Sequence, residues 1–173
     1  MREWDVEGVW DGQFLRDGAA PGEGVPFTLT LKEGWFGRFR GTVREDPARG
    51  GVPEEGRIRG RVKGFNLRFV KWMPVLYMPD GTTASRYILE TQGVDVQHEI
   101  GHPPVIYEGR YDPENDRARG AWLFGPYKIF IWIDGVSVRH EVGRATGTWE
   151  IRRSKAWPIG PSDGVTHAFP PQR

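Results

Sequence analysis

The sequence carries one short pattern, Gly-X-Trp, three times: Gly8-Val9-Trp10 near its start, Gly120-Ala121-Trp122, and Gly147-Thr148-Trp149 near its end. In a β-strand the residues i and i+2 share a face, so each glycine lies on the same side as its tryptophan. A glycine beside an indole allows neighbouring backbone to approach it closely. The three copies therefore predict a closed antiparallel β-barrel.

Short runs of alternating apolar and polar residues surround these copies, and Gly/Pro turns separate the runs. The pattern predicts strands at 8–14, 26–32, 35–43, 57–63, 65–72, 105–111, 117–124, 128–133 and 145–152. The less regular middle of the chain allows a strand at 86–91 and a short helical turn within 93–104. The expected fold is all-β, a single up-and-down antiparallel barrel of about 8–10 strands with little helix, because closure removes unpaired edges.

Length and composition fit one domain with a large aromatic core. The chain has 173 residues, of which 13% are aromatic, enough to pack a barrel without disulfides. We expect the barrel to span residues 1–153 with an irregular insertion at 73–104, followed by a Pro/Gly-rich tail at 154–173.

Charge and cysteine content exclude several classes of protein. The chain has no cysteine, no run resembling a signal peptide and no long apolar segment, so we expect a cytoplasmic protein without thiolate chemistry. Its 24 Lys and Arg nearly balance 23 Asp and Glu, which predicts neither a nucleic-acid nor a membrane partner. A basic row at Arg57, Arg59, Arg61 and Lys63 is interpreted as the solvent face of a half-buried strand.

The chain resembles the calycin-type barrels, the group of the avidins, lipocalins and fatty-acid-binding proteins. The resemblance covers about two-thirds of the chain and rests on these segments: 8–12, 27–31, 58–60, Phe69, 107–109, 120–122 and 147–149. It implies that Trp10 plugs one end of the barrel, whereas the polar ligand contacts of biotin binders have no assignable counterparts here. The spacing of Gly8, Trp10 and Gly12 also looks like the opening of nitrobindin-type haem barrels, although their later motifs do not follow. No cofactor is expected, with haem and zinc kept as alternatives.

Candidate ligand-binding residues follow from the expected barrel interior. Lys71 shares a strand face with Phe69, so it either anchors a ligand among aromatic side chains or reaches water at the strand end. Tyr107 and Tyr111 share a face and either offer hydroxyls to a ligand or belong to the core. Trp10, Trp122 and Trp149 are expected to fill the barrel as a structural plug rather than to cage a cofactor.

The segment from His98 to His102 matches the zinc motif H-E-x-x-H. In zincins this motif lies on a helix, which places both histidines on one Zn²⁺ and leaves the glutamate, here Glu99, as the catalytic base. Pro103 and the β-branched neighbours disfavour a helix here, and no third ligand stands out.

These observations lead to one main function and two alternatives. We expect a non-catalytic barrel that binds a small, partly apolar ligand at its open end, with 73–104 as a lid. The first alternative is an interaction module or homo-oligomer that uses the apolar strand 129–133. The second is a zinc-dependent hydrolase built on His98, Glu99 and His102.

Overall fold

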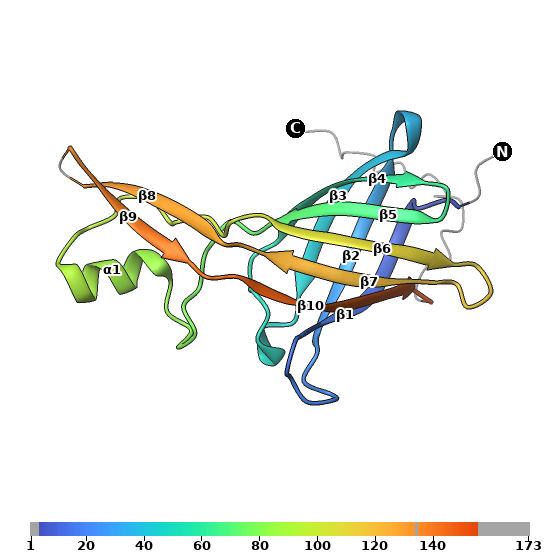
Figure 1. Ribbon diagram of the computed structural model, residues 1–173, viewed down its shortest axis with the longest axis horizontal. Coiled ribbons are helices and arrows are strands. Elements are labelled where there is room, and N and C mark those ends of the chain that lie inside the picture. Colours follow the sequence, from blue (N-terminus) through green and yellow to red (C-terminus); the bar gives the residue numbers. More distant parts are fainter. Residues whose placement is uncertain (1–3, 134, 156–173) are drawn as a thin grey trace, which may run out of the picture.

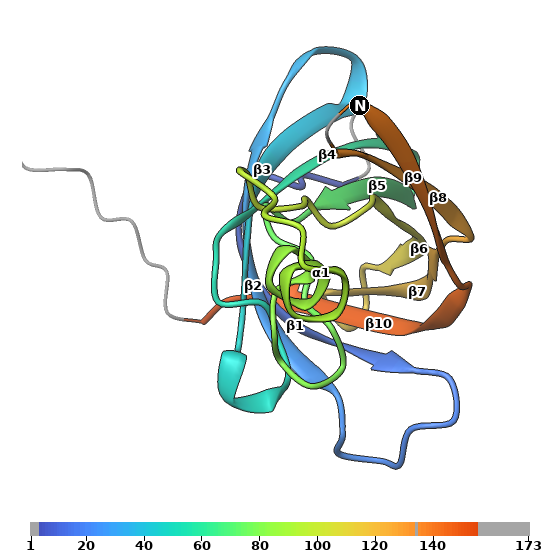
Figure 2. The same ribbon diagram turned by 90° about the vertical axis from the view of Figure 1, so that its left-hand side faces the viewer.

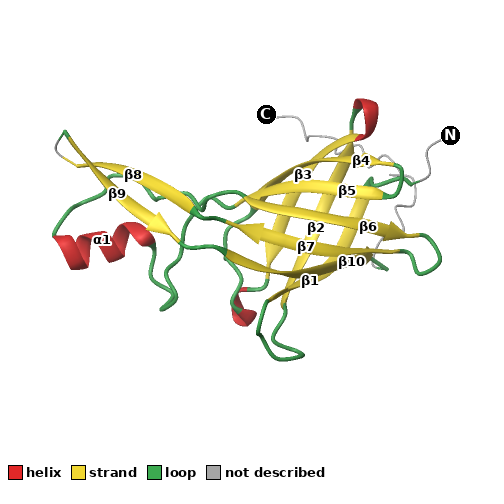
Figure 3. Ribbon diagram, in the orientation of Figure 1, coloured by secondary structure: helices red, strands yellow, loops and turns green. Residues whose placement is uncertain are grey.

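The computed structural model describes residues 4–133 and 135–155, and strands dominate it (Figures 1 and 3). The strands are β1 (Gly8–Arg16), β2 (Val25–Glu33), β3 (Arg38–Glu45), β4 (Gly56–Lys63), β5 (Asn66–Trp72), β6 (Val105–Asp112), β7 (Arg117–Phe124), β8 (Tyr127–Ile133), β9 (Val136–Val142) and β10 (Ala145–Arg153). The helical elements are α1 (Ala84–Gln92) and the short 3-10 turns η1 (Trp35–Gly37) and η2 (Pro47–Arg49).

Eight of these strands close into one antiparallel barrel in the order β1-β10-β7-β6-β5-β4-β3-β2. Each barrel strand pairs with its neighbour in the chain, except that the chain leaves the barrel after β7 and returns at β10. In between, β8 and β9 form a separate two-stranded hairpin. The all-β, up-and-down barrel predicted from the sequence is confirmed.

The Gly-X-Trp copies on β7 and β10 pair reciprocally inside the barrel. Gly147 lies opposite Trp122, and Gly120 lies opposite Trp149. A Cβ atom at Gly147 would lie 2.5 Å from the indole nitrogen Nε1 of Trp122, so the missing side chain makes room for the ring. Gly147 thus accommodates the indole of Trp122, whereas the indole of Trp149 is accommodated by Gly109 on β6, where a Cβ atom would lie 2.6 Å from its Cζ2.

One end of the barrel is closed by aromatic side chains. Trp10 is fully buried and donates a hydrogen bond from Nε1 to the carbonyl of Val6 at 2.9 Å. The Trp4 ring packs edge-on against Trp10 with centroids 5.6 Å apart and stacks on Tyr111 at 4.4 Å. We call this end the plug end and the opposite end, where β7 leaves the barrel, the mouth.

An extension stands beyond the mouth and consists of α1, the hairpin β8–β9 and their connections. Seen along the barrel, α1 lies in front of the lumen (Figure 2). The extension buries apolar residues that do not belong to the barrel core: Val75, Ala84, Ile88 and Ile131. No helix among the described residues is long and apolar enough to cross a membrane.

Two local expectations from the sequence are wrong, and one strand was missed. Residues 93–104 form no helical turn. The segment 86–91 is helical rather than extended, because the Thr83 hydroxyl caps the helix by accepting from Arg86 N at 3.3 Å and Gly93 ends it at φ 70°. Strand β9 was not expected, although Val136, Val138 and Val142 alternate with polar residues. The predicted tail lies almost entirely outside the described residues.

Candidate functional site

A buried ion pair lies inside the barrel at its mouth. Lys71 is the last inward residue of β5, and Glu45 is the inward residue at the end of β3. The Lys71 ammonium binds one carboxylate oxygen of Glu45, and the two side chains are only 7% and 3% exposed. The second carboxylate oxygen accepts a hydrogen bond from Val52 N at 2.9 Å. Both oxygens of Glu45 therefore have partners inside the protein.

Aromatic rings surround the ammonium. Lys71 Nζ lies 4.6 Å from the centre of the Phe14 ring and 5.5 Å from that of Tyr107. Tyr107 in turn stacks on Phe69 with centroids 4.6 Å apart. Burial alone would lower the pKa of Lys71, but its interactions with Tyr107 and Glu45 outweigh burial and raise the pKa above its ordinary value. The ammonium therefore stays protonated, and burial raises the pKa of the Tyr107 phenol so that it stays neutral.

His102 lies at the same mouth on the segment that leads from the extension into β6. Its half-buried ring contacts Phe124 at a centroid distance of 4.9 Å, and its Nδ1 lies 2.6 Å from the Pro103 carbonyl. Burial lowers the pKa of His102, so the ring is neutral at neutral pH. Because Nδ1 faces a carbonyl, it carries the proton and leaves Nε2 as an acceptor.

The structure brings together three of the four residues predicted to bind a ligand. Lys71, Phe69 and Tyr107 lie near one another on β5 and β6, in the mouth half of the barrel. Tyr111 lies at the plug end instead, where its hydroxyl donates to Asp116 at 2.7 Å. Burial and Asp116 raise the pKa of Tyr111 to about 12.

The strand predicted at 35–43 ended two residues before Glu45, so the inward position of this carboxylate was missed. The signal was present, because Phe39, Gly41, Val43 and Glu45 follow one another at every second position of the same strand. Extending that alternation by one step predicts that the Glu45 carboxylate faces the interior of the barrel.

The three tryptophans of the repeated pattern lie at different depths. Trp10 belongs to the plug end, and Trp149 contacts Phe69 in the middle of the core at 5.4 Å. Trp122 lies toward the mouth, where its ring contacts Phe14 edge-on at 6.1 Å. All three are buried.

The H-E-x-x-H segment is not helical, so its histidines are not set one helical turn apart. His98 is exposed, and Glu99 accepts a hydrogen bond from the Ser85 hydroxyl of α1. No group of three His, Cys, Asp or Glu residues with metal-binding geometry occurs in the part of the chain that the structure describes. The geometry gives the zinc alternative no support.

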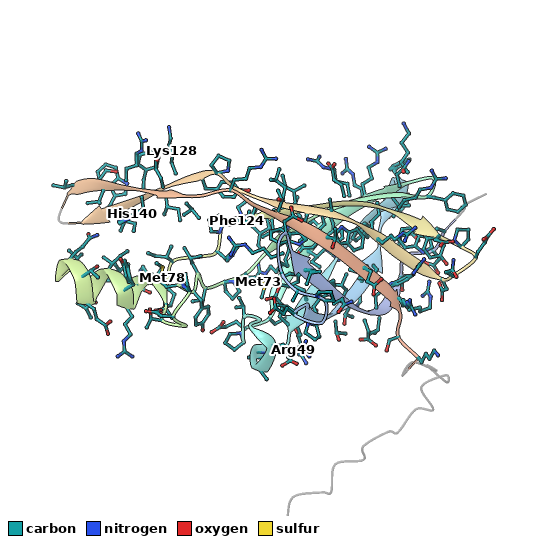
Figure 4. The ribbon with its side chains drawn as sticks, turned by 60° about the horizontal axis from the view of Figure 1, so that its bottom comes forward. Arg49, Met73, Met78, Phe124, Lys128 and His140 are labelled. Carbon is teal, nitrogen blue, oxygen red and sulfur yellow. The ribbon has the colours of Figure 1, made fainter. Side chains whose placement is uncertain are left out.

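At the mouth, an ammonium, a carboxylate, a phenol and a neutral imidazole thus lie among aromatic rings. Such a site can hold the polar end of a small molecule while the rings contact its apolar part. Figure 4 shows Met73 and Phe124 where the barrel meets the extension, with His140 on the hairpin side that faces Met78. No family model, curated protein or solved structure is significantly similar to this chain, so its function is argued from this site.

Proposed function

We propose that the barrel binds a small, partly apolar molecule at its mouth, without turnover. The observation that carries this proposal is the buried ion pair of Lys71 and Glu45. Removing two charges from water costs free energy. Apolar side chains in the same positions would stabilise an aromatic-packed barrel at least as well as the ion pair does. Buried charges of this kind concentrate at functional sites.

The chemistry of the mouth defines the ligand class. Lys71 can donate to a carbonyl or carboxylate oxygen, and the Nε2 atom of His102 can accept from a hydroxyl or amide. The ring of Phe14, next to the Lys71 ammonium, and the ring of Phe124, next to His102, supply apolar surface. We infer a ligand with at least one acceptor and one donor on an apolar frame, enclosed by α1 and the hairpin as a lid (Figure 2).

A relationship to the calycin barrels is part of the same proposal. It is supported by the eight-stranded up-and-down order and by the position of Trp10 in the plug. In this chain the mouth carries an additional extension, of which α1 is inserted between β5 and β6 and the hairpin β8–β9 between β7 and β10.

Native mass spectrometry of protein purified from its own cells tests the ligand proposal. We expect the wild type to carry an added small-molecule mass, and the double variant Lys71→Met/Glu45→Leu to lose it. The matched control is Lys128→Met/Glu141→Leu, which removes an exposed Lys-Glu pair at facing positions of the hairpin. A wild type without added mass, or a ligand retained equally by both double variants, would contradict the proposal.

A second candidate function is self-association through the outer face of the hairpin. Phe130 and Trp132 are 60% and 74% exposed there, on the side away from the buried Ile131. The subunit number in the same mass spectra tests this candidate. A dimer that becomes a monomer in Phe130→Ser/Trp132→Ser supports it, and a monomeric wild type excludes it.

A further inference from the structure

The outer wall of β3, β4 and β5 gathers cationic side chains. Alternation along each strand points them to solvent while their neighbours face the core. All seven are exposed: Arg38, Arg40, Arg57, Arg59, Arg61, Lys63 and Arg68. We call this surface the arginine wall. The whole chain has a net charge of only +1, so this surface is far more positive than the protein as a whole.

The strand register sets these cations directly against one another. Arg40 lies opposite Arg59, and Arg61 lies between Arg38 on one side and Arg68 on the other. Directly opposite residues have Cβ atoms about 4.5–5.5 Å apart, and like charges at that separation destabilise a sheet. In the described part of the chain only Arg68 of this group has a carboxylate partner, Glu108 at 2.8 Å. A bound anion would relieve this repulsion.

The wall also contains a surface depression of about 540 Å³. Arg59, Arg61, Lys63 and Arg68 line it, together with Glu108. Val70, Gly60 and Gly109 line it as well, so the depression combines cationic side chains with uncharged surface. Such a surface fits a chain that carries regularly spaced negative charges on one side and flat apolar groups on the other.

Exposed aromatic side chains flank the wall at both ends of the strands. Trp72 is 37% exposed and lies opposite Arg57 at the mouth end of β4. Trp35 and Phe36 are 83% and 82% exposed in η1, which contacts β4 at the plug end. Phe36 has φ 60°, a region that residues other than glycine rarely adopt, and there its ring points to solvent. The strand length between these ends is about 20 Å, from the six intervals of about 3.3 Å between Arg57 and Lys63.

We propose that the arginine wall binds single-stranded nucleic acid, with phosphates on the cations of β4 and bases stacked on the flanking aromatic rings. Rows of arginine combined with exposed aromatic side chains are the usual means of holding single strands without sequence preference. A membrane surface fits less well, because the β6–β7 turn at the same end as Trp35 carries Asp112, Glu114 and Asp116. The inference departs from the expectation based on net charge, and it is independent of the ligand proposed for the mouth.

Fluorescence anisotropy with labelled oligothymidylate and oligouridylate of about 12 nucleotides tests this proposal. We expect binding that weakens as salt rises from about 50 to 200 mM, with a slope of log K against log salt near −3 for about four phosphate contacts. Arg59→Gln/Arg61→Gln should weaken binding at least about tenfold and make the slope shallower by about 1.4.

The matched control is Arg144→Gln/Arg152→Gln, which removes two exposed arginines on the β10 side, four strands from β4 in either direction around the barrel. It should bind like the wild type. Trp72→Leu should weaken binding about five- to a hundredfold without changing the salt slope, because stacking releases no counterions. Thermal unfolding of each variant confirms that the fold is kept.

Four results would overturn the proposal. They are no binding of either oligonucleotide at low salt, tighter binding of a duplex of the same length, binding of phosphatidylserine vesicles in place of the oligonucleotide, and equal losses in the wall and control variants. Lys71→Met/Glu45→Leu, which should empty the mouth, is expected to bind the oligonucleotides unchanged. This separates failure of one proposal from failure of the other.

Discussion

Gly147→Ala is expected to unfold the barrel or to lower its free energy of unfolding by more than about 3 kcal/mol. A Cβ atom at this position would overlap the carbonyl oxygen of Leu15 and lie 2.5 Å from the indole nitrogen of Trp122. Neither group can move freely, because the Trp122 indole donates to that same carbonyl at 3.1 Å and β1 is held by two neighbours. One methyl group would therefore disturb β1, β7 and β10 together.

Gly120→Ala should have an effect of similar size, since its Cβ would overlap the Glu108 carbonyl and lie 2.5 Å from Cα of Gly109. Chemical denaturation followed by tryptophan fluorescence measures both variants. Gly143→Ala is the matched control, because nothing lies within 4 Å of a Cβ there, and it should change stability by no more than about 0.5 kcal/mol. If Gly147→Ala is as stable as Gly143→Ala, the close approach of Gly147 to Leu15 and Trp122 is not required for the stability of the barrel.

Glu45→Ala is expected to cost about 3–5 kcal/mol of stability, because it leaves the Lys71 ammonium buried without its counter-ion. Glu55→Ala removes the carboxylate of a nearby exposed ion pair with Arg44, and should cost at most about 1 kcal/mol. Comparing the stability losses of the two variants separates the effect of burying an unpaired charge from the effect of losing a carboxylate.

The double variant Glu45→Leu/Lys71→Met should recover most of the stability lost in Glu45→Ala, since it removes both charges and fills the space with apolar groups. Denaturation midpoints of all four proteins measure this. A double variant as unstable as Glu45→Ala would show that the ion pair supports the barrel itself, and would remove the argument that it is kept for a ligand. Equal stability of Glu45→Ala and Glu55→Ala would contradict the buried position of the pair.

The sequence predicted the barrel because its decisive signals are local. Alternation along each strand and the Gly-X-Trp spacing can be read within a few residues, and they located nine of the ten strands and the inward tryptophans. Helix α1 was misread because its β-branched and aromatic residues outweighed a cap at Thr83 and a stop at Gly93. Thr83 and Gly93 indicated a helix in this segment more reliably than its β-branched and aromatic residues indicated a strand.

The functional surfaces were harder to predict because they depend on contacts between distant parts of the chain. Lys71 and Glu45 meet only when β5 and β3 close into one barrel, and Arg40 meets Arg59 only through the register of β3 and β4. Net charge and single-strand patterns contain no information on such pairings. Alternation could still have identified Glu45 as an inward acid, which is the residue of the site that local reasoning should have found.

The excursion between β7 and β10 has a consequence for how the chain folds. The barrel closes where β1 pairs with β10, for example through the hydrogen bond from Gln13 to Glu150, 137 positions apart. Until β10 has been synthesised, β1 and β7 remain open edges, and the hairpin and α1 emerge from the ribosome before the seam can form. Long-range closure of this kind is slow and leaves edges available for wrong pairing. The edges of β1 and β7 are therefore protected only once β10 has paired with both. Truncations before residue 145 should yield aggregates rather than a smaller barrel.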